Sequence, residues 1–199
     1  MACRFGKAEE AIQMKQVGRV KMYLVSAYFD EKTNKILNRH MEKIAENTGN
    51  TFMTENHVPP HMTVSSVEAR TGELLIPYVK KLQETLTEGP VQFVSVGMFF
   101  PYVMYVAPVL NAYLQNLQEQ VFRSVCSAPE VTVSRFYRPM QWMPHITMGK
   151  KMTEEQMQIA FRVMQERFVP FEGKVTAIGL AKTNPHEDFL QIRLKEGQE

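Results

Sequence analysis

Apolar and polar residues alternate along the chain in two periods, one typical of strands and one typical of helices. Residues 22–29 form a short β-rich run, and residues 31–47 place apolar side chains on one helical stripe. Gly49 can end that helix, because glycine readily adopts the left-handed conformation common at helix C-termini. The pattern predicts a strand and a long helix, after a polar lead-in over residues 1–20 with a short helix around Glu9–Gln16.

The same periods predict the remaining elements. Thr71 and Thr153 stand where a helix N-cap is expected, since a threonine hydroxyl can accept a hydrogen bond from an unpaired helix N–H. Pro101 and Asn184-Pro185 separate paired apolar runs and predict hairpin turns. The further predicted helices span about 72–88, 110–127 and 154–167, and the further predicted strands span 61–67, 91–100, 102–106, 131–136, 145–149, 173–181 and 189–194.

The second half of the chain repeats the plan of the first. Each half holds a His-x-Thr run, a polar turn, a helix that follows a threonine, and a hairpin with proline in its turn. The interval from His61 to Val91 equals that from His145 to Val175, at 30 residues. Matching motifs at matching register indicate a duplicated unit. We therefore expect an α+β fold, a single bilobal domain over residues 1–199 whose duplicated β/α lobes have antiparallel sheets facing a central cleft.

The paired His-x-Thr runs are the strongest candidate for chemistry. Side chains two residues apart in a strand point to the same face. His61 and Thr63 therefore project together in the motif at 61–64, as do His145 and Thr147 in the motif at 145–148. If the lobes pack about a pseudo-twofold axis, one cleft holds two imidazoles and two hydroxyls.

Such a set of side chains suits a phosphodiester substrate. One neutral imidazole can take a proton from the attacking hydroxyl or water while the other, as imidazolium, protonates the leaving oxygen. The two threonine hydroxyls can donate hydrogen bonds to the non-bridging phosphate oxygens. Acid, base and phosphate donors are then all present, so we expect no metal and no cofactor. Either histidine can serve as acid or as base.

The motifs HMTV and HITM resemble the paired signatures of the two-histidine (2H) phosphoesterase superfamily, which includes 2′-5′ RNA ligase-like and cyclic phosphodiesterase proteins. The likeness covers about residues 20–196. It implies a bilobal, LigT-like fold and a metal-free reaction on 2′,3′-cyclic phosphates or 2′-5′ linkages of RNA or nucleotides, as in RNA processing. It also implies that His61 and His145 are the acid–base pair and that Thr63 and Thr147 bind the phosphate.

Other residues near the motifs are candidates for substrate binding. Trp142, Tyr137 and Arg138 lie in an aromatic and basic loop before the second motif, where rings suit base stacking and arginine suits phosphate contact, although packing within the lobe accounts for them equally well. Ser65 shares the parity of His61 and Thr63, so it is a candidate phosphate donor.

Composition sets limits on the remaining possibilities. Apolar residues make up 44% of 199 residues, enough for a proper core, and a net charge of +2 disfavours a nucleic-acid coat protein. The two cysteines indicate reduced thiols rather than a disulfide framework. No apolar run approaches the roughly 20 residues of a membrane span, and the first residues do not resemble a signal peptide. We expect a cytoplasmic monomer without membrane contact.

Three functions remain open at this point. The favoured one is a metal-independent hydrolase, in which the same acid–base pair can also run the reverse ligation. A second is a non-catalytic module that binds an RNA end or a nucleotide in the same cleft. A third is a metal-dependent hydrolase that uses His57 and His61, whose H-x-x-x-H spacing suits zinc on a helix, although Pro59 and Pro60 lie between them.

Overall fold

The computed structural model describes residues 20–182 and 187–197. The short helix expected around Glu9–Gln16 and the turn expected at Asn184-Pro185 lie outside these residues. The described elements, in chain order, are β1 (Lys21–Phe29), α2 (Glu31–Thr48), α3 (Phe52–Glu55), β2 (Met62–Ala69), α4 (Ile76–Thr85), β3 (Gly89–Phe99), β4 (Val103–Pro108), α5 (Ala112–Cys126), β5 (Thr132–Val133), a 3-10 turn (Arg135–Tyr137), β6 (Ile146–Lys150), α6 (Glu154–Arg167), β7 (Phe171–Lys182) and β8 (Glu187–Arg193).

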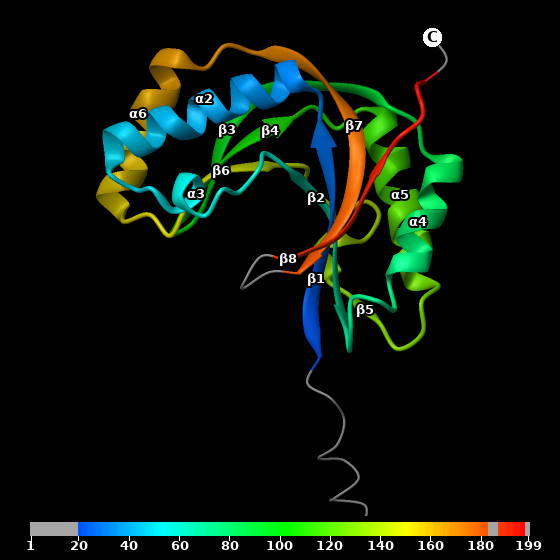
Figure 1. The fold of residues 1–199 in the computed structure, drawn as a ribbon. Helices are drawn as coiled ribbons and strands as arrows, with labels where there is room; N and C mark the ends of the chain where they lie inside the picture. Colours follow the sequence, from blue (N-terminus) through cyan, green and yellow to red (C-terminus); the bar gives the residue numbers. More distant parts are fainter. Residues whose placement is uncertain (1–19, 183–186, 198–199) are drawn as a thin grey trace, which may run out of the picture.

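The strands form one eight-stranded sheet in which every pair of named strands is antiparallel. The main path runs β1-β2-β6-β4-β3-β7-β8, β5 pairs with β2, and β1 also pairs with β7. The long strand β7 makes this possible, because residues 171–175 pair with β3 and residues 175–182 pair with β1. The sheet therefore bends back on itself, as Figure 1 shows, and the predicted antiparallel α+β fold is confirmed.

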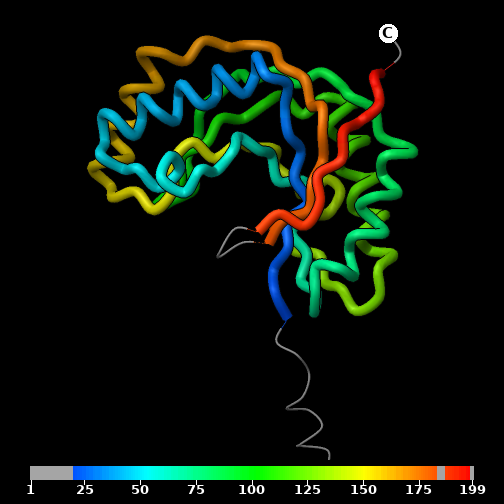
Figure 2. Tube along the Cα trace, viewed as in Figure 1, coloured from blue at the N-terminus to red at the C-terminus, as the bar shows by residue number. Residues whose placement is uncertain are grey.

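Two pairs of helices cover the sheet on either side of this bend (Figure 1). Helices α2 and α6 pack together over β6 and β4, while α4 and α5 pack together over β2 and β8. Helix α2 follows β1 in the chain but contacts β6, and α5 follows β4 but contacts β2. Figure 2 shows the result, with the blue α2 beside the yellow and orange α6. Each helix pair thus combines one helix from each half of the chain.

The helix ends show why these segments are helical. The Asp30 side chain accepts a hydrogen bond from the Thr33 N–H at the start of α2, and Gly49 ends that helix with φ of 68°. Thr153 and Gln156 form a reciprocal capping box at the start of α6. The predicted roles of Gly49 and Thr153 are confirmed, and the hairpin predicted around Pro101 is present between β3 and β4.

Two predicted elements are shorter than expected. Helix α4 begins at Ile76 rather than near residue 72, and no side chain caps it, so the cap expected from Thr71 is wrong. Pro77 explains the later start, because proline is accommodated in the first turn of a helix and disrupts later turns. The strand expected over 131–136 is limited to β5 and gives way to the 3-10 turn.

The core lies between the sheet and the two helix pairs. Apolar side chains from α2 and α5 are fully buried against the strands, as the helical stripes predict. Methionine contributes strongly to this core, because its unbranched side chain fills irregular gaps. The buried methionines of the strands and of the turn after β6 are Met62, Met104, Met148 and Met152. None of the described helices is both long and apolar enough to cross a bilayer.

Candidate active site

The two His-x-Thr motifs meet where β2 pairs with β6. Met62 lies directly opposite Ile146 in an antiparallel register, and both side chains are fully buried in the core. Continuing that register by one residue in each direction places His61 opposite Thr147 and Thr63 opposite His145. All four side chains then project from the face opposite to that of Met62 and Ile146. Directly opposite residues have Cβ atoms about 4.5–5.5 Å apart, so this register predicts that the four groups form one compact cluster.

The two imidazoles are held in the same way. His61 Nδ1 lies 2.8 Å from the Pro59 carbonyl oxygen, and His145 Nδ1 lies 2.9 Å from the Met143 carbonyl oxygen. A carbonyl only accepts, so each Nδ1 carries the proton. In the neutral tautomer Nε2 is then the basic nitrogen of both rings, as general acid–base chemistry requires. The duplicated motif thus includes the carbonyl two residues before each histidine.

Aromatic rings surround His145. The Phe99 ring meets the imidazole edge-on with centroids 4.8 Å apart, and the Tyr105 ring lies 5.6 Å away. Burial lowers the pKa of His145 below its ordinary value, and the hydrogen bond to Met143 offsets only part of that shift. His145 is therefore predominantly neutral at pH 7. Phe99 ends β3 and Tyr105 lies in β4, so the β3–β4 hairpin supplies both rings beside His145.

Tyr28 is the aromatic neighbour of His61, at a centroid distance of 6.4 Å. Burial, with a smaller contribution from the charge of Asp188, raises the pKa of Tyr28 to about 12, so its phenol stays protonated at neutral pH. Two glycines make room for the rings on either side. A Cβ atom on Gly97 would overlap the Tyr105 ring, and one on Gly179 would lie 2.9 Å from the Tyr28 ring.

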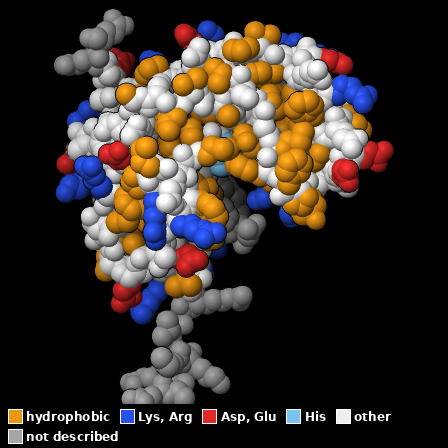
Figure 3. Space-filling model, turned by 180° about the vertical axis from the view of Figure 1, so that it is seen from behind, with side chains coloured by type: hydrophobic (Ala, Val, Ile, Leu, Met, Phe, Trp, Pro, Cys, Tyr) orange, Lys and Arg blue, Asp and Glu red, His pale blue; other side chains and the backbone are white. Residues whose placement is uncertain are grey.

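The space-filling view shows a hollow in the face opposite to the view of Figure 1. In Figure 3 histidine atoms lie at the bottom of a hollow, with hydrophobic side chains on both sides of it. The exposed apolar side chains near the second motif include Phe99, Phe100 and Tyr102 of the β3–β4 hairpin.

Ser65 does not share the face of His61 and Thr63, which corrects the expectation from parity. The register between β1 and β2 shifts between Val25 and Ser26, so that Ser26 lies opposite Thr63 and Val25 opposite Ser65. One extra residue in β2, a β-bulge, reverses the facing of the residues that follow it. Ser65 accordingly points into the core with Val25, fully buried.

Ser66 takes the place that parity gave to Ser65. Ser66 lies opposite Leu24 of β1. Leu24 and Ser26 are two residues apart and point to the same face of β1, and Ser26 lies opposite Thr63. Ser66 is therefore on the face of the two motifs. The hydroxyl of Ser65 has no hydrogen-bond partner within the described part of the chain. No feature of the sequence distinguishes these adjacent serines, because the bulge is set by the pairing with β1.

Trp142 is buried in the core, Tyr137 packs against the core, and Arg138 lies at the surface. Trp142 is 7% exposed, and its indole N–H donates a hydrogen bond to the Thr63 carbonyl at 2.9 Å, so it offers no open ring face for base stacking. Tyr137 packs against the core, and its carbonyl accepts a hydrogen bond from Gln118 of α5. Arg138 is exposed beside Cys126 of α5. These positions favour a structural role over substrate contact.

His57 lies in the turn between α3 and β2 with φ of 49°, so the H-x-x-x-H spacing does not fall on one helix turn. Within residues 20–182 and 187–197, no group of three or more His, Cys, Asp or Glu side chains is arranged to hold a metal ion. The metal-dependent alternative therefore has no ligand set in this part of the chain.

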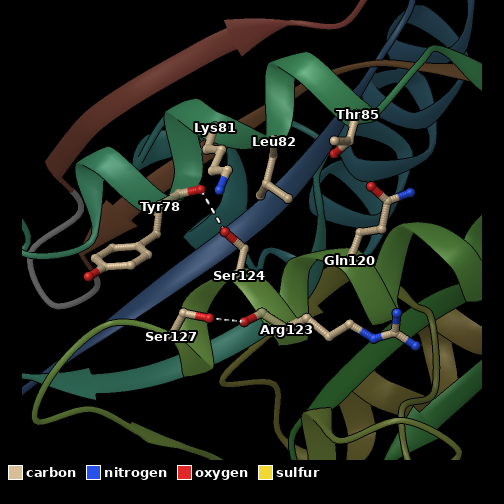
Figure 4. A pocket seen from close by; sticks show the side chains of 8 residues that line it. All are labelled: Tyr78, Lys81, Leu82, Thr85, Gln120, Arg123, Ser124 and Ser127. Atoms are coloured by element: carbon tan, nitrogen blue, oxygen red, sulfur yellow. Dashed lines mark hydrogen bonds between the residues drawn. The ribbon is translucent and has the colours of Figure 1, made fainter.

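Two cavities of the described residues lie outside the cluster. Figure 4 shows one of about 310 Å³ between α4 and α5, lined by Tyr78, Lys81 and Ser124 among others. The Ser124 hydroxyl donates to the Tyr78 carbonyl at 2.8 Å, so it is already engaged. A larger cavity of about 510 Å³ lies beside Arg39 and His40 of α2. Neither His61 nor His145 lines these spaces.

A family model described as the 2′-5′ RNA ligase superfamily matches residues 35–187, a stretch that includes both motifs. The chain belongs to the 2′-5′ RNA ligase superfamily. This confirms the resemblance to two-histidine phosphoesterases. No curated protein matches the chain significantly.

Solved structures share the fold of this superfamily member at low sequence identity. The protein TT0787 of Thermus thermophilus is 14% identical with a TM-score of 0.57, covering 89% of this chain and 100% of its own. E. coli LigT, solved with 3′-AMP, is 11% identical with a TM-score of 0.51, covering 90% of this chain and 100% of its own. The predicted LigT-like fold is thus confirmed over most of the chain.

Proposed function

We propose that this protein is a metal-independent phosphoesterase that acts on 2′,3′-cyclic phosphates or 2′-5′ phosphodiester bonds of RNA or nucleotides. The observation that carries the proposal is the pairing of Met62 with Ile146, which brings both His-x-Thr motifs onto one face. Membership of the 2′-5′ RNA ligase superfamily supports a phosphoester substrate. Two imidazoles and two hydroxyls around one point match the needs of phosphoryl transfer without a metal.

In the proposed reaction a water oxygen attacks phosphorus as a ribose oxygen leaves. One neutral imidazole accepts the proton of the water, the new P–O bond forms, and the other imidazole, protonated, gives its proton to the leaving ribose oxygen. Burial of His145 between Phe99 and Tyr105 favours its neutral form, which suits the base. His61 then serves as the acid. If the 5′-hydroxyl of a second strand takes the place of water, it forms the new P–O bond as the 3′ oxygen of the cyclic phosphate leaves, and the same proton transfers yield a 2′-5′ linkage, so the arrangement is compatible with ligation.

The threonines and the aromatic rings complete the proposed site. Thr63 and Thr147 stand across from the histidine of the other motif, where their hydroxyls can donate to non-bridging phosphate oxygens as charge builds there. Phe99 and Tyr28 offer ring surfaces on the two sides of the cluster. Ring surfaces beside a phosphate site suit nucleotides, whose bases stack on aromatic side chains. The complex of E. coli LigT with 3′-AMP supports this choice of substrate class.

The test is hydrolysis of 2′,3′-cyclic mononucleotides and 2′-5′-linked dinucleotides in the presence of EDTA. We expect wild-type turnover to survive chelation and to fall by about 10²–10⁴-fold in His61→Ala and in His145→Ala, the range for loss of a general acid or base. His57→Ala is the matched control and should keep full activity, because His57 lies outside the cluster. Full activity in either cluster variant, or loss of activity with EDTA, would contradict the proposal.

The binding-module alternative predicts a different outcome of the same assay. A protein that only holds an RNA end would bind a cyclic nucleotide tightly and release no product over days. The like orientation of both imidazoles argues for turnover, since binding alone does not require two rings with their Nδ1 protons fixed by backbone carbonyls. Tight binding without product by the wild-type protein would favour the alternative.

A further inference from the structure

Trp142 connects the two motifs although it belongs to neither. It lies in the loop before β6, three residues ahead of His145, and it is buried in the core. Its indole N–H reaches across to the main chain of the first motif and donates to the Thr63 carbonyl at 2.9 Å. This buried hydrogen bond joins residues 79 positions apart in the chain.

The bond fills a gap along one edge of β2. On that edge β6 pairs with β2 at Met62, and β5 pairs with it at Val67 and Glu68. Between these points the Ser66 carbonyl accepts the Ser134 N–H, and the Thr63 carbonyl accepts the indole N–H. A buried carbonyl without a partner is costly, so Trp142 supplies a donor where no strand does.

The same loop also orients the second motif. Met143, the residue after Trp142, provides the carbonyl that holds Nδ1 of His145. A shift of Trp142 would therefore move Thr63 through the indole bond and His145 through the Met143 carbonyl. The two groups come from opposite motifs, and one short stretch of backbone sets the spacing between them.

We propose that Trp142 is a positioning residue, whose indole N–H fixes Thr63 relative to His145. It does not touch the substrate. The expected effect on the rate rests on the proposed function, because the distance between Thr63 and His145 affects catalysis only if a phosphate is held between them. Small errors in the position of reacting groups reduce the rate of the chemical step more than they weaken substrate binding.

Since the chain contains one tryptophan, global replacement of tryptophan changes only this residue. Growth with the benzothienyl analogue, in which sulfur takes the place of the indole N–H, keeps the shape of the ring and removes the donor. We expect kcat for a 2′,3′-cyclic nucleotide to fall about 10- to 100-fold with KM changed less than about threefold, in line with the cost of slight misplacement. Trp142→Phe should likewise lower kcat with little change in KM, and it should also cause a larger loss of stability.

Two controls separate this effect from general destabilisation. Leu82→Val removes one methylene from a buried residue of α4, a helix that packs against α5 and β8, and should leave kcat unchanged at a temperature where it is fully folded. 4-Fluorotryptophan retains the N–H donor and should restore kcat to within about twofold of the wild type, since the hydrogen bond is kept.

The outcomes distinguish this inference from the proposed function. Substituted enzyme with wild-type kcat would overturn the positioning role and leave the phosphoesterase proposal intact. If wild-type protein turned over no substrate, the proposed function would fail, and the role of Trp142 would be tested by binding instead. In that case the ¹⁵N-indole resonance should shift when phosphate is added, and an unmoved resonance in a protein that binds phosphate would overturn the inference.

Discussion

Met62 and Ile146 face each other across β2 and β6, and each directly follows the histidine of its own motif. This pair has two consequences. It buries two large side chains in the core, and it sets the distance between the polar groups on the opposite face of the same strands. Packing of the core and geometry of the site are therefore linked at one point of the sheet.

Ile146→Ala should destabilise the fold by about 2–5 kcal/mol, the range for truncation of a fully buried aliphatic side chain. Urea denaturation followed by circular dichroism measures the change. We also expect kcat to fall at a temperature where the variant is folded, because a cavity beneath the pairing lets the two strands shift.

Val169→Ala is the control for that experiment. Val169 is 71% exposed in the segment between α6 and β7, so its truncation should change stability by no more than about 0.5 kcal/mol. If Ile146→Ala lowered the free energy of unfolding no more than Val169→Ala does, the pair Met62 and Ile146 would not be what holds β2 and β6 together.

The site could be predicted from the sequence where strand parity alone decides it. His61 with Thr63, and His145 with Thr147, share a face because side chains alternate along any strand. Ser65 could not be placed in this way, because the bulge beside Thr63 depends on how β1 pairs with β2. Such register shifts arise from contacts between distant segments and leave no local pattern.

Long-range packing explains the other differences. The sequence makes Trp142 a candidate for base stacking, because a loop tryptophan near arginines suits that role, but its ring faces the core and its N–H meets Thr63. The packing of α2 against β6 could not be predicted either. The apolar stripe of a helix shows which of its faces is buried, but not which strand that face covers. The strand that each helix covers is determined by the order of the strands in the sheet.

Replacing Thr63 or Thr147 with valine tests the phosphate donors. Each change removes a hydroxyl and nearly keeps the shape, so we expect kcat to fall about 10²–10³-fold, as for loss of one donor to a developing oxyanion. Thr→Ser at the same positions should retain most of the activity, because the hydroxyl remains. Single-turnover kinetics with a cyclic nucleotide measures the step. Equal rates for the valine and serine variants would exclude a donor role.

Gly97→Ala should disturb the site through Tyr105. The new methyl group would overlap the outer atoms of the Tyr105 ring, which lies beside both Phe99 and His145. The ring can move aside, so we expect little loss of stability but a reduced kcat/KM.

A double-mutant cycle with Tyr105→Ala checks this cause. Once the ring is absent the methyl group meets no obstacle, so Gly97→Ala should have almost no further effect in the Tyr105→Ala background. Additive losses in the double variant would show that Gly97 acts by another route.

The lowered pKa of His145 predicts how stability depends on pH. In the unfolded chain the imidazole titrates near its ordinary value of about 6.5, whereas burial keeps it neutral to lower pH in the folded protein. Between the two values the unfolded state binds more protons, so stability rises with pH through this window and is lost as pH falls through the folded pKa. The melting temperature of the wild type should therefore fall more steeply from about pH 7 to about pH 5 than that of His145→Asn. Equal slopes, or an NMR titration midpoint of His145 at or above about 6.5, would show that burial does not hold this ring in the neutral form that the proposed base requires.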